Sequence, residues 1–248
     1  MILAAGLGTR LKPLTDKIPK ALVEIEGMPM LERIIMKLQN QGFDRIVINV
    51  HHFSDMIINY LSVRNYDAEI KISDESTKLL DTGGGIVHAM DKLFSEDNDP
   101  VLFHNVDILS NADLKGLMNM NMNSGNGGTL LVSSRPSNRK LIFDKDMSLK
   151  GWHDLKNDVF KPQNFKLKGE DIERSFSGIY VLTREAVEEM KNLRDNDRFS
   201  VMDYFLNPQR KIKLNGVCDD NLQLLDIGKP ASLMQASKIL ELLNKDPN

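Results

Sequence analysis

A glycine-containing turn near the start of the chain is followed by two cations. The segment from Leu3 to Lys20 reads LAAGLGTRLKPLTDKIPK, in which Gly6 and Gly8 interrupt an apolar strand. Glycines let backbone N–H groups approach an anion, and Arg10 and Lys20 can neutralise its charge. The pattern predicts a polyphosphate site, while the simpler interpretation is a tight turn with two solvated cations.

Two common phosphate-binding motifs do not fit this turn. A dinucleotide fingerprint requires a third glycine at the position that Leu11 occupies. A Walker loop requires Gly-Lys followed by Ser or Thr, and the chain contains no such triplet. The turn therefore indicates a different mode of phosphate binding.

Two aspartates are candidate metal ligands. Asp107 and Asp226 each end an expected strand, and ligands of a mainly parallel sheet bind beyond the carboxyl ends of its strands. Two distant carboxylates can therefore converge there, and a few carboxylates completed by phosphate oxygens suit Mg²⁺. From spacing alone, two separate turn or helix-cap aspartates are the more common arrangement.

The elements that must position these residues alternate between strands and helices. Short runs rich in Ile, Val and Leu alternate with segments of helical period, which is typical of βαβ units around a mainly parallel sheet. In the first half of the chain we expect strands at Met1–Ala5, Arg45–Val50, Glu69–Ile72 and Val101–Val106, and helices beginning near Met30, Ser54, Gly85 and Ser110. The first strand is short, and we expect one or two residues to precede it in the natural gene.

Polar residues before these helices are candidate caps. Ser54, Thr82, and Ser110 or Asn111 can each accept a hydrogen bond from a first-turn N–H group. The run from Met118 to Gly128 is dense in Met, Asn and Gly, which predicts a loop.

Beyond Thr129 the pattern changes to short strands separated by turns, which predicts an antiparallel extension. The expected strands are Thr129–Ser133, Leu141–Phe143, Leu149–Trp152, Ser177–Leu182, Lys211–Val217 and Leu222–Ile227. The expected helices are one capped by Thr183, a short one near Val201–Leu206, and a final one from Ser232.

Composition excludes several classes of protein. The 248 residues carry 32 Lys plus Arg against 35 Asp plus Glu, and this balance disfavours nucleic-acid binding. The hydrophobic fraction of 41% fits a globular protein, and Cys218 alone can form no internal disulfide. We expect neither a signal peptide nor a membrane span, and hence a cytoplasmic protein. The five histidines show no paired metal-ligand spacing.

The turn resembles the G-x-G-T-R-L-x-P-L-T…P-K motif of the nucleoside-diphosphate-sugar pyrophosphorylases, which are sugar-1-phosphate nucleotidyltransferases. Further motifs of that family follow in the same order. LLDTGGGI from Leu79 resembles the second glycine-rich loop, HNVD from His104 the strand-end aspartate motif, FSGIYVL from Phe176 the sugar loop, and LLDIGKPASL from Leu224 the C-terminal motif.

The resemblance implies an α/β, Rossmann-like (GT-A-like) nucleotidyltransferase fold. Its mixed, mainly parallel central sheet would be flanked by helices and carry a small antiparallel sugar-binding extension. We expect a single domain over residues 1–248, with a nucleotide-binding part at about 1–133, a sugar-binding part at about 134–228 and a C-terminal helix at 229–248. It would be a monomer or a small homo-oligomer.

The resemblance also implies roles for individual residues. The nucleotide would contact Ala5, Gly6, Gly8, Thr9, Arg10, Lys20, Gly83 and Gly84. The sugar phosphate would contact Asp81, Asn105, Ser177, Gly178 and Lys161, although Asn105 fits equally well as a satisfied strand residue. Arg10, Lys20 and Asp107 would be catalytic, and Asp107 and Asp226 would hold Mg²⁺.

One departure from the family concerns the acceptor. Many hexose 1-phosphate members use the lysine of an E-K-P motif, whereas Lys161 lies in a Phe-Lys-Pro sequence without the glutamate. The DTGGGI run is most similar to that of N-acetylmuramic acid 1-phosphate uridylyltransferases, which favours UTP, that acceptor or another N-acetylhexosamine 1-phosphate, and cell-wall recycling. The alternatives are guanylyl transfer to mannose or heptose 1-phosphate, cytidylyl transfer to phosphocholine, and a nucleotide-sugar-sensing module without turnover.

Overall fold

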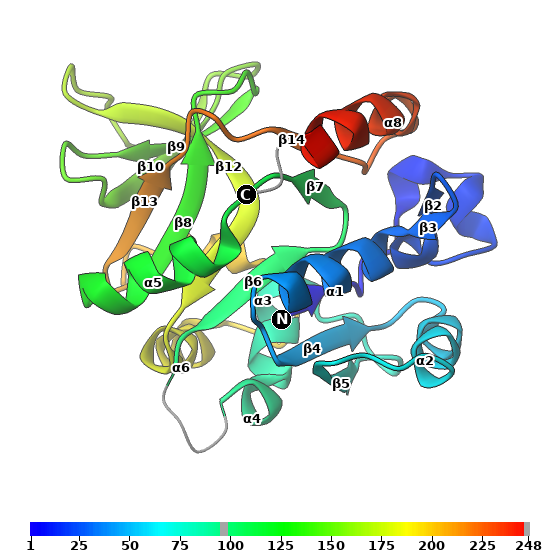
Figure 1. The fold of residues 1–248 in the computed structure, drawn as a ribbon. Helices are drawn as coiled ribbons and strands as arrows, with labels where there is room; N and C mark the ends of the chain where they lie inside the picture. Colours follow the sequence, from blue (N-terminus) through cyan, green and yellow to red (C-terminus); the bar gives the residue numbers. More distant parts are fainter. Residues whose placement is uncertain (95–98, 246–248) are drawn as a thin grey trace.

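A ten-stranded mixed sheet runs through the structure, a computed structural model that describes residues 1–94 and 99–245 (Figure 1). The strands are β1 Ile2–Leu3, β2 Glu24–Ile25, β3 Met28–Pro29, β4 Arg45–Val50, β5 Glu69–Asp74, β6 Val101–Asn105, β7 Ile108–Ser110, β8 Gly128–Ser133, β9 Arg139–Phe143, β10 Leu149–Asp154, β11 Val159–Lys161, β12 Ile172–Leu182, β13 Leu214–Cys218 and β14 Leu224–Asp226. The main path runs β11-β10-β9-β12-β6-β1-β4-β5, and β8 joins β12 to β13.

Helices cover both faces of this sheet. They are α1 Met30–Asn40, α2 Ser54–Ser62, α3 Asp81–His88, α4 Met90–Leu93, α5 Leu114–Ser124, α6 Arg184–Leu193, α7 Val201–Phe205 and α8 Pro230–Lys245, with 3-10 turns η1 Thr9–Leu11, η2 Leu14–Asp16 and η3 Lys20–Leu22. Within the described ranges, no helix is both long enough and apolar enough to cross a membrane.

The sheet separates two hydrophobic cores because successive side chains of a strand point to opposite faces. Ile2 and Leu102 belong to the core that α1, α2 and α5 cover, whereas their neighbours Leu3 and Phe103 belong to the core that α3, α4, α6 and α7 cover. Strands β6, β1, β4 and β5 are parallel, as expected for strands that are covered on both faces. The predicted fold class is confirmed.

The antiparallel extension begins at β12. This strand pairs with β6 and β8 in the central sheet and, through Ile172, Glu173 and Arg174, with β9. It is longer than the predicted Ser177–Leu182 because its first half continues into the β9–β10–β11 part. The register shifts between Phe176 and Tyr180, so β12 is irregular just where it leaves the central sheet.

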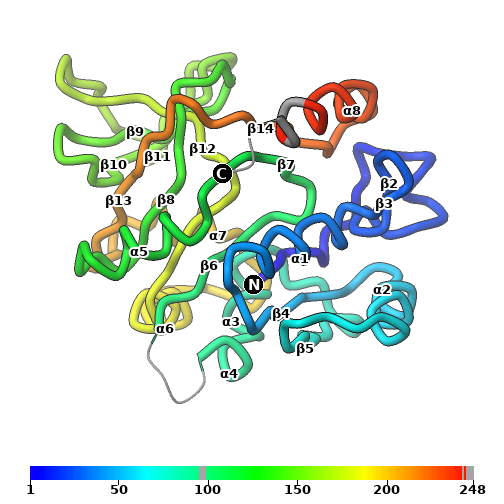
Figure 2. The backbone as a smooth tube through the Cα atoms, viewed as in Figure 1, coloured from blue at the N-terminus to red at the C-terminus, as the bar shows by residue number. Residues whose placement is uncertain are grey.

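A small ribbon of β7 and β14 connects the sheet to the C-terminal helix. Leu224, Leu225 and Asp226 pair antiparallel with Ser110, Leu109 and Ile108. Figure 2 shows the chain passing from β13 through β14 to α8, which lies beside β2 and β3. A third core cluster fastens this corner, with Ile25, Met30, Leu109, Ile227, Ala236 and Leu240.

Three predicted helix starts are wrong, although the helices themselves form. The helix predicted from Gly85 begins at Asp81, and Thr82 lies inside it, accepting instead a hydrogen bond from Val201 N of α7 at 2.9 Å. Phe53 rather than Ser54 precedes α2. Asp113, whose side chain accepts from Gly116 N, caps α5, because Ser110 belongs to β7. Tertiary pairing therefore decided how these polar side chains are used.

The loop predicted from Met118 is also wrong, because α5 continues to Ser124. Leu114, Leu117 and Asn121 form its buried face. The Asn121 amide donates to Thr129 Oγ1 at 3.0 Å, so the tertiary contact compensates for the weak helix propensity of asparagine. Gly125, with a φ of 65°, ends the helix. The predicted Thr183 cap of α6 is confirmed.

We predict that Gly84→Ala destabilises the fold. A Cβ at Gly84 would collide with the carbonyl oxygen of Asp197, so α3 would have to move away from the segment that leads into α7. Overpacking of this kind costs about 1–3 kcal/mol, which exceeds the gain of about 1 kcal/mol from helix propensity. Denaturant unfolding measures the loss. Gly169→Ala is the control, since a Cβ there has no neighbour within 4 Å, and equal stability of the two variants would contradict the packing argument.

Candidate functional site

The two glycines of the turn after β1 have different surroundings: Gly8 is tightly packed, whereas Gly6 faces open space. Gly8 has a φ of 65°, and its carbonyl accepts from Leu11 N at 2.8 Å and from Thr15 Oγ1 at 2.8 Å. A Cβ at Gly8 would lie 2.8 Å from Thr15 Cγ2, whereas a Cβ at Gly6 would meet nothing within 4 Å. Gly8 therefore allows the turn to close, and Gly6 leaves free space in front of the backbone.

A small cavity of about 180 Å³ lies where β1, β4 and β6 end. Its lining contains the expected site residues Ala5, Gly6, Lys20, Asp81, Asn105 and Asp107, together with Leu3, Asn49, Leu79, Thr82 and Val106. The structure thus gathers residues from distant segments at the carboxyl edge of the parallel strands, where ligands of such sheets bind. We call it the small cavity.

Lys20 and Asp107 form an ion pair at this edge. The Lys20 ammonium donates to Asp107 Oδ2, and the two side chains are 14% and 13% exposed. Lys20 opens η3, which is connected to the glycine turn, and Asp107 follows β6. The pair ties the turn to the sheet edge and places both charges in the wall of the small cavity.

A second cation and carboxylate lie on the neighbouring segments. Arg10 Nη1 is 4.0 Å from Asp226 Oδ2, and Gly228 N donates to Asp226 Oδ1 at 2.7 Å. The side chains of Arg10 and Asp226 are 55% and 45% exposed, so this pair by itself contributes little to stability. The contact places an exposed cation near the carboxylate.

The β7–β14 ribbon brings the two aspartates together. Asp226 is opposite Ile108, and Ile227 N donates to the carbonyl of Asp107 at 2.8 Å. The predicted route, through two strand ends of one parallel sheet, is wrong for Asp226, because β14 pairs antiparallel with β7 outside that sheet. Antiparallel pairing puts the end of one strand beside the start of the other, and Asp107 directly precedes that start.

This donor set fits Mg²⁺. Mg²⁺ is usually held by one or two carboxylates completed by substrate phosphates and water, and Asp107 and Asp226 provide two carboxylates on adjacent backbone segments. Among the residues that the structure describes, no cluster of three or more His, Cys, Asp or Glu side chains could form a protein-only metal site. Phosphate oxygens and water would complete the coordination at the two carboxylates.

A large cavity of about 570 Å³ adjoins the small one. Five expected residues line it, namely Asn105, Lys161, Ser177, Gly178 and Asp226. Asn105 lines both cavities, so the two meet beside the candidate metal ligands. Further polar or aromatic lining residues, which the sequence did not single out, are Arg135, Ser137, Arg139, Lys140, Trp152, Ser200 and Asp203.

Gly178 fits closely against Asn105. Gly178 has a φ of 78°, and a Cβ there would lie 2.6 Å from Asn105 Nδ2. The hydroxyl of the preceding Ser177 already accepts from Ile179 N at 3.1 Å and is buried. The irregular middle of β12 thus orients the amide at the junction of the cavities.

Some expected nucleotide contacts are engaged elsewhere. The N–H groups of Gly83 and Gly84 both donate to the carbonyl of Phe199, at 2.9 and 3.2 Å. Thr9 and Arg10 lie in η1, outside the linings of both cavities. Asp81 has a φ of 61°, a conformation uncommon for residues other than glycine, and its Oδ1 accepts from Thr82 N at 2.7 Å.

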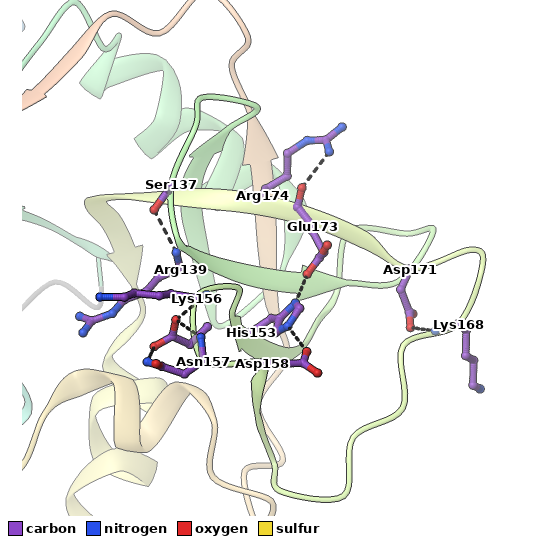
Figure 3. A network of polar contacts seen from close by, with 11 residues as sticks. Ser137, Arg139, His153, Lys156, Asn157, Asp158, Lys168, Asp171, Glu173 and Arg174 are labelled. Carbon is purple, nitrogen blue, oxygen red and sulfur yellow. Dashed lines mark hydrogen bonds and ion pairs between the residues drawn. The ribbon is translucent and has the colours of Figure 1, made fainter.

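The β10–β11 hairpin supplies Trp152 and Lys161 to the large cavity. Figure 3 shows His153 between Glu173 and Asp158, which it contacts through Nδ1 at 2.8 Å and Nε2 at 3.1 Å. Burial lowers the pKa of His153, but hydrogen bonds and charges from both carboxylates outweigh it and raise the pKa above its ordinary value. Lys161 Nζ lies 5.8 Å from the centre of the Trp152 ring, within cation–π range.

A buried carboxyl supports the glycine turn from below. Asn49 accepts from Ala4 N at 2.8 Å and donates to Glu75 Oε1 at 2.8 Å. Glu75 is 2% exposed, and a Cβ at Gly85 would lie only 2.5 Å from its Oε1. Gly85 is therefore required for packing over Glu75. Asn49 links Glu75 to the backbone of Ala4, just before the glycine turn.

Comparisons of the sequence point to one family. A family model described as "Nucleotidyl transferase" matches residues 1–242. The chain is 42% identical over 110 residues to N-acetylmuramate alpha-1-phosphate uridylyltransferase of Caulobacter vibrioides, an alignment that covers 43% of this chain and 44% of that protein. It is 32% identical to mannose-1-phosphate guanyltransferase of Saccharomyces cerevisiae over 77% of this chain and 52% of that protein. The matches span about half the length of these relatives, or less.

The fold also has close relatives among solved structures. HddC from Yersinia pseudotuberculosis superposes with a TM-score of 0.75 at 25% identity, covering 96% of this chain and 97% of that one. The likeness therefore extends over the sheet, the antiparallel extension and the C-terminal segment alike.

We predict that Glu75→Gln stabilises the protein at neutral pH. Burial raises the pKa of Glu75 above its ordinary value near 4.5, against the opposing hydrogen bond from Asn49. A group whose pKa is raised on folding stabilises the fold below its unfolded pKa and loses that contribution as the pH rises through the folded pKa. The uncharged glutamine keeps an oxygen for Asn49, so the Tm gain should be present at about pH 7 and vanish near about pH 4.

Thermal unfolding across this range measures the difference, with the exposed Glu170→Gln as a charge-matched control. A Tm difference that is independent of pH would contradict the assignment of a buried, destabilising charge.

Proposed function

The chain belongs to the nucleotidyl transferase family, as its motifs predicted, and we propose that it transfers a nucleotidyl group from a nucleoside triphosphate to a sugar 1-phosphate and releases pyrophosphate. The observation that carries the proposal is the junction of the two cavities. There, the Lys20–Asp107 pair, Asp226 and Asn105 stand between a small cavity walled by the glycine turn and a large cavity walled by the antiparallel extension.

The small cavity suits the triphosphate. The free space at Gly6 admits phosphate oxygens to the backbone, and Lys20 brings a positive charge to the same wall. Arg10 is half-exposed in the loop after the glycine turn, where it would offset charge on the outgoing pyrophosphate. The large cavity, with its cations, suits the sugar 1-phosphate.

The reaction requires positioning and charge neutralisation. An oxygen of the acceptor phosphate attacks the α-phosphorus in line, and the bond from that phosphorus to the oxygen of the β-phosphate breaks. The attacking oxygen is already an anion, so no protein base is needed and no covalent enzyme intermediate forms. Lys20 and Arg10 offset the charge that develops on the phosphates, and Asn105 orients the acceptor at the junction.

Mg²⁺ fits this scheme at Asp107 and Asp226. These two carboxylates would hold the ion, which when bound would supply Lewis-acid neutralisation of phosphate charge. Lys20, which pairs with Asp107, would hold that carboxylate in place at the edge of the sheet.

We propose N-acetylmuramic acid 1-phosphate as the acceptor and UTP as the donor, which would place the enzyme in cell-wall recycling. The uridylyltransferase of Caulobacter vibrioides and the DTGGGI run support this choice. The charge of the large cavity supports it too, since its lining cations outnumber its carboxylates: Arg135, Arg139, Lys140 and Lys161 against Asp203 and Asp226. An acceptor with a carboxylate as well as a phosphate would use this excess.

Guanylyl transfer to mannose 1-phosphate is the second candidate, favoured by the guanyltransferase relatives. Guanylyl transfer to heptose 1-phosphate, cytidylyl transfer to phosphocholine and a nucleotide-sugar sensor without turnover are the remaining ones. The ion pairs of Asp107 with Lys20 and of Asp226 with Arg10 favour turnover, because a sensor would not require them.

The substrate prediction is tested by pyrophosphate release. Purified protein with Mg²⁺ is incubated with each nucleoside triphosphate and with N-acetylmuramic acid 1-phosphate, N-acetylglucosamine 1-phosphate or mannose 1-phosphate. We expect release with UTP and the first acceptor, and at least about tenfold lower kcat/KM for the second, which lacks the carboxylate. Faster release with GTP and mannose 1-phosphate would replace the substrate pair, and nucleotide binding without any release would favour the sensor.

The catalytic roles predict severe effects of single substitutions. Lys20→Ala and Asp107→Asn should each lower kcat/KM by at least about a hundredfold, because the first removes a cation that neutralises phosphate charge and the second removes a carboxylate that would hold Mg²⁺. Lys17→Ala is the control, as Lys17 is an exposed cation of the same loop outside both cavity linings. Full activity of either site variant with Mg²⁺ would refute the assignment.

A further inference from the structure

Arg135 lies just beyond the end of β8 and lines the large cavity beside Asp226. It matches none of the family motifs that the sequence contains. The sequence signal for it is weak, consisting only of a cation placed directly after a predicted strand. Its surroundings nevertheless show a highly organised side chain.

The backbone of Arg135 is held by two side-chain donors. Its carbonyl accepts from Lys140 Nζ at 2.8 Å and from Ser175 Oγ at 2.6 Å. Lys140 Nζ also lies 2.7 Å from Ser175 Oγ, and Ser175 is fully buried. A surface arginine has no such support, so the position of this residue is fixed from beneath.

The guanidinium is only partly satisfied. Arg135 Nη2 donates to the carbonyl of Phe176 at 2.8 Å, while Nε is buried and has no hydrogen-bond partner among the described residues. Burial lowers the pKa of Arg135 and the charge of Asp226 raises it, yet no carboxylate of the described chain forms an ion pair with it within 4.0 Å. A half-buried cation without a paired anion is costly, which indicates that the cavity is built to receive one.

We propose that Arg135 binds the phosphate of the acceptor sugar 1-phosphate and orients it toward the α-phosphorus. This inference rests on the proposed function. Arg135 lines the large cavity together with Asp226, the expected metal ligand, whereas Lys161 lies over Trp152 on the exposed hairpin. Arg139, the next arginine along the chain, is exposed on β9.

The chemistry of the guanidinium suits this task. A planar fork with several N–H donors can bind two phosphate oxygens at once and leave the third free to attack. Its attachment to Phe176 O ties it to the same irregular stretch of β12 that orients Asn105 through Gly178. Arg135 and Asn105 would thus both contact the phosphate of the acceptor. The missing E-K-P glutamate fits this division, since Lys161 need not be the phosphate ligand.

The experiment compares Arg135→Gln and Arg135→Lys with Arg174→Gln. Arg174→Gln is the control, because it removes the same charge next to Ser175 from a residue that lies outside the lining of the large cavity. Binding of N-acetylmuramic acid 1-phosphate and of mannose 1-phosphate is measured by calorimetry with Mg²⁺, alongside KM for both substrates, kcat and Tm. For Arg135→Gln we expect acceptor Kd and KM to rise at least tenfold while KM for the nucleotide changes less than twofold. Arg135→Lys should lie in between, and Arg174→Gln should match the wild type.

Two results would overturn the proposal. One is unchanged acceptor binding in Arg135→Gln. The other is a fall in Tm accompanied by equal rises in both KM values for Arg135→Gln and Arg135→Lys alike, which would mark Arg135 as a support for Phe176 only. Calorimetry separates this test from that of the proposed function, because a wild type that binds the acceptor without releasing pyrophosphate would refute turnover and still report on Arg135.

Discussion

The ion pair between Lys20 and Asp107 is the contact on which the site depends. It joins the loop after the glycine turn to the end of β6, two segments that the chain separates by 87 residues. With both side chains largely shielded from water, removing one partner would leave the other charge poorly solvated. The pair therefore requires the loop to stay folded over the sheet edge, and this in turn fixes the space in front of Gly6.

The rest of the architecture brings three further segments to that pair. The β7–β14 ribbon carries Asp226 to it, Asn49 holds the strand before the turn, and the irregular middle of β12 presents Gly178 to Asn105. Each of these contacts involves the backbone of at least one partner. The rotameric freedom of side chains therefore has little influence on where Asp226 and Asn105 lie. The carboxylates and the amide are thus preorganised, whereas Arg10 remains exposed and adaptable.

Local sequence patterns predicted the parts whose structure is decided locally. The β-branched run Arg45–Val50 forms a strand with those bounds, and α1 begins at Met30, because burial on both sides of the sheet agrees with the hydrophobic pattern. The predicted caps were wrong where a tertiary partner competed for the side chain, as when Thr82 accepts a hydrogen bond from Val201. The loop predicted from Met118 was wrong because a hydrogen bond to Thr129 stabilises Asn121 within the helix. Asp226 was identified by motif, but its route to Asp107 depends on a long-range strand pairing that no local pattern records.

The two cavities also differ in how far local sequence patterns identify their lining residues. The small cavity is built around the glycine turn, and in the proposed reaction it binds phosphate groups that all triphosphates share, so short motifs identify most of its residues. In the proposed reaction the large cavity distinguishes acceptors. Its cations come from β9, β11 and the segment after β8, whose meeting depends on the register of the antiparallel extension. Arg135 shows the consequence: its neighbours Lys140, Ser175 and Phe176 lie up to 41 residues away and make it a fixed cation. A residue of this kind is defined by its supports, and these can be found only once the strands are paired.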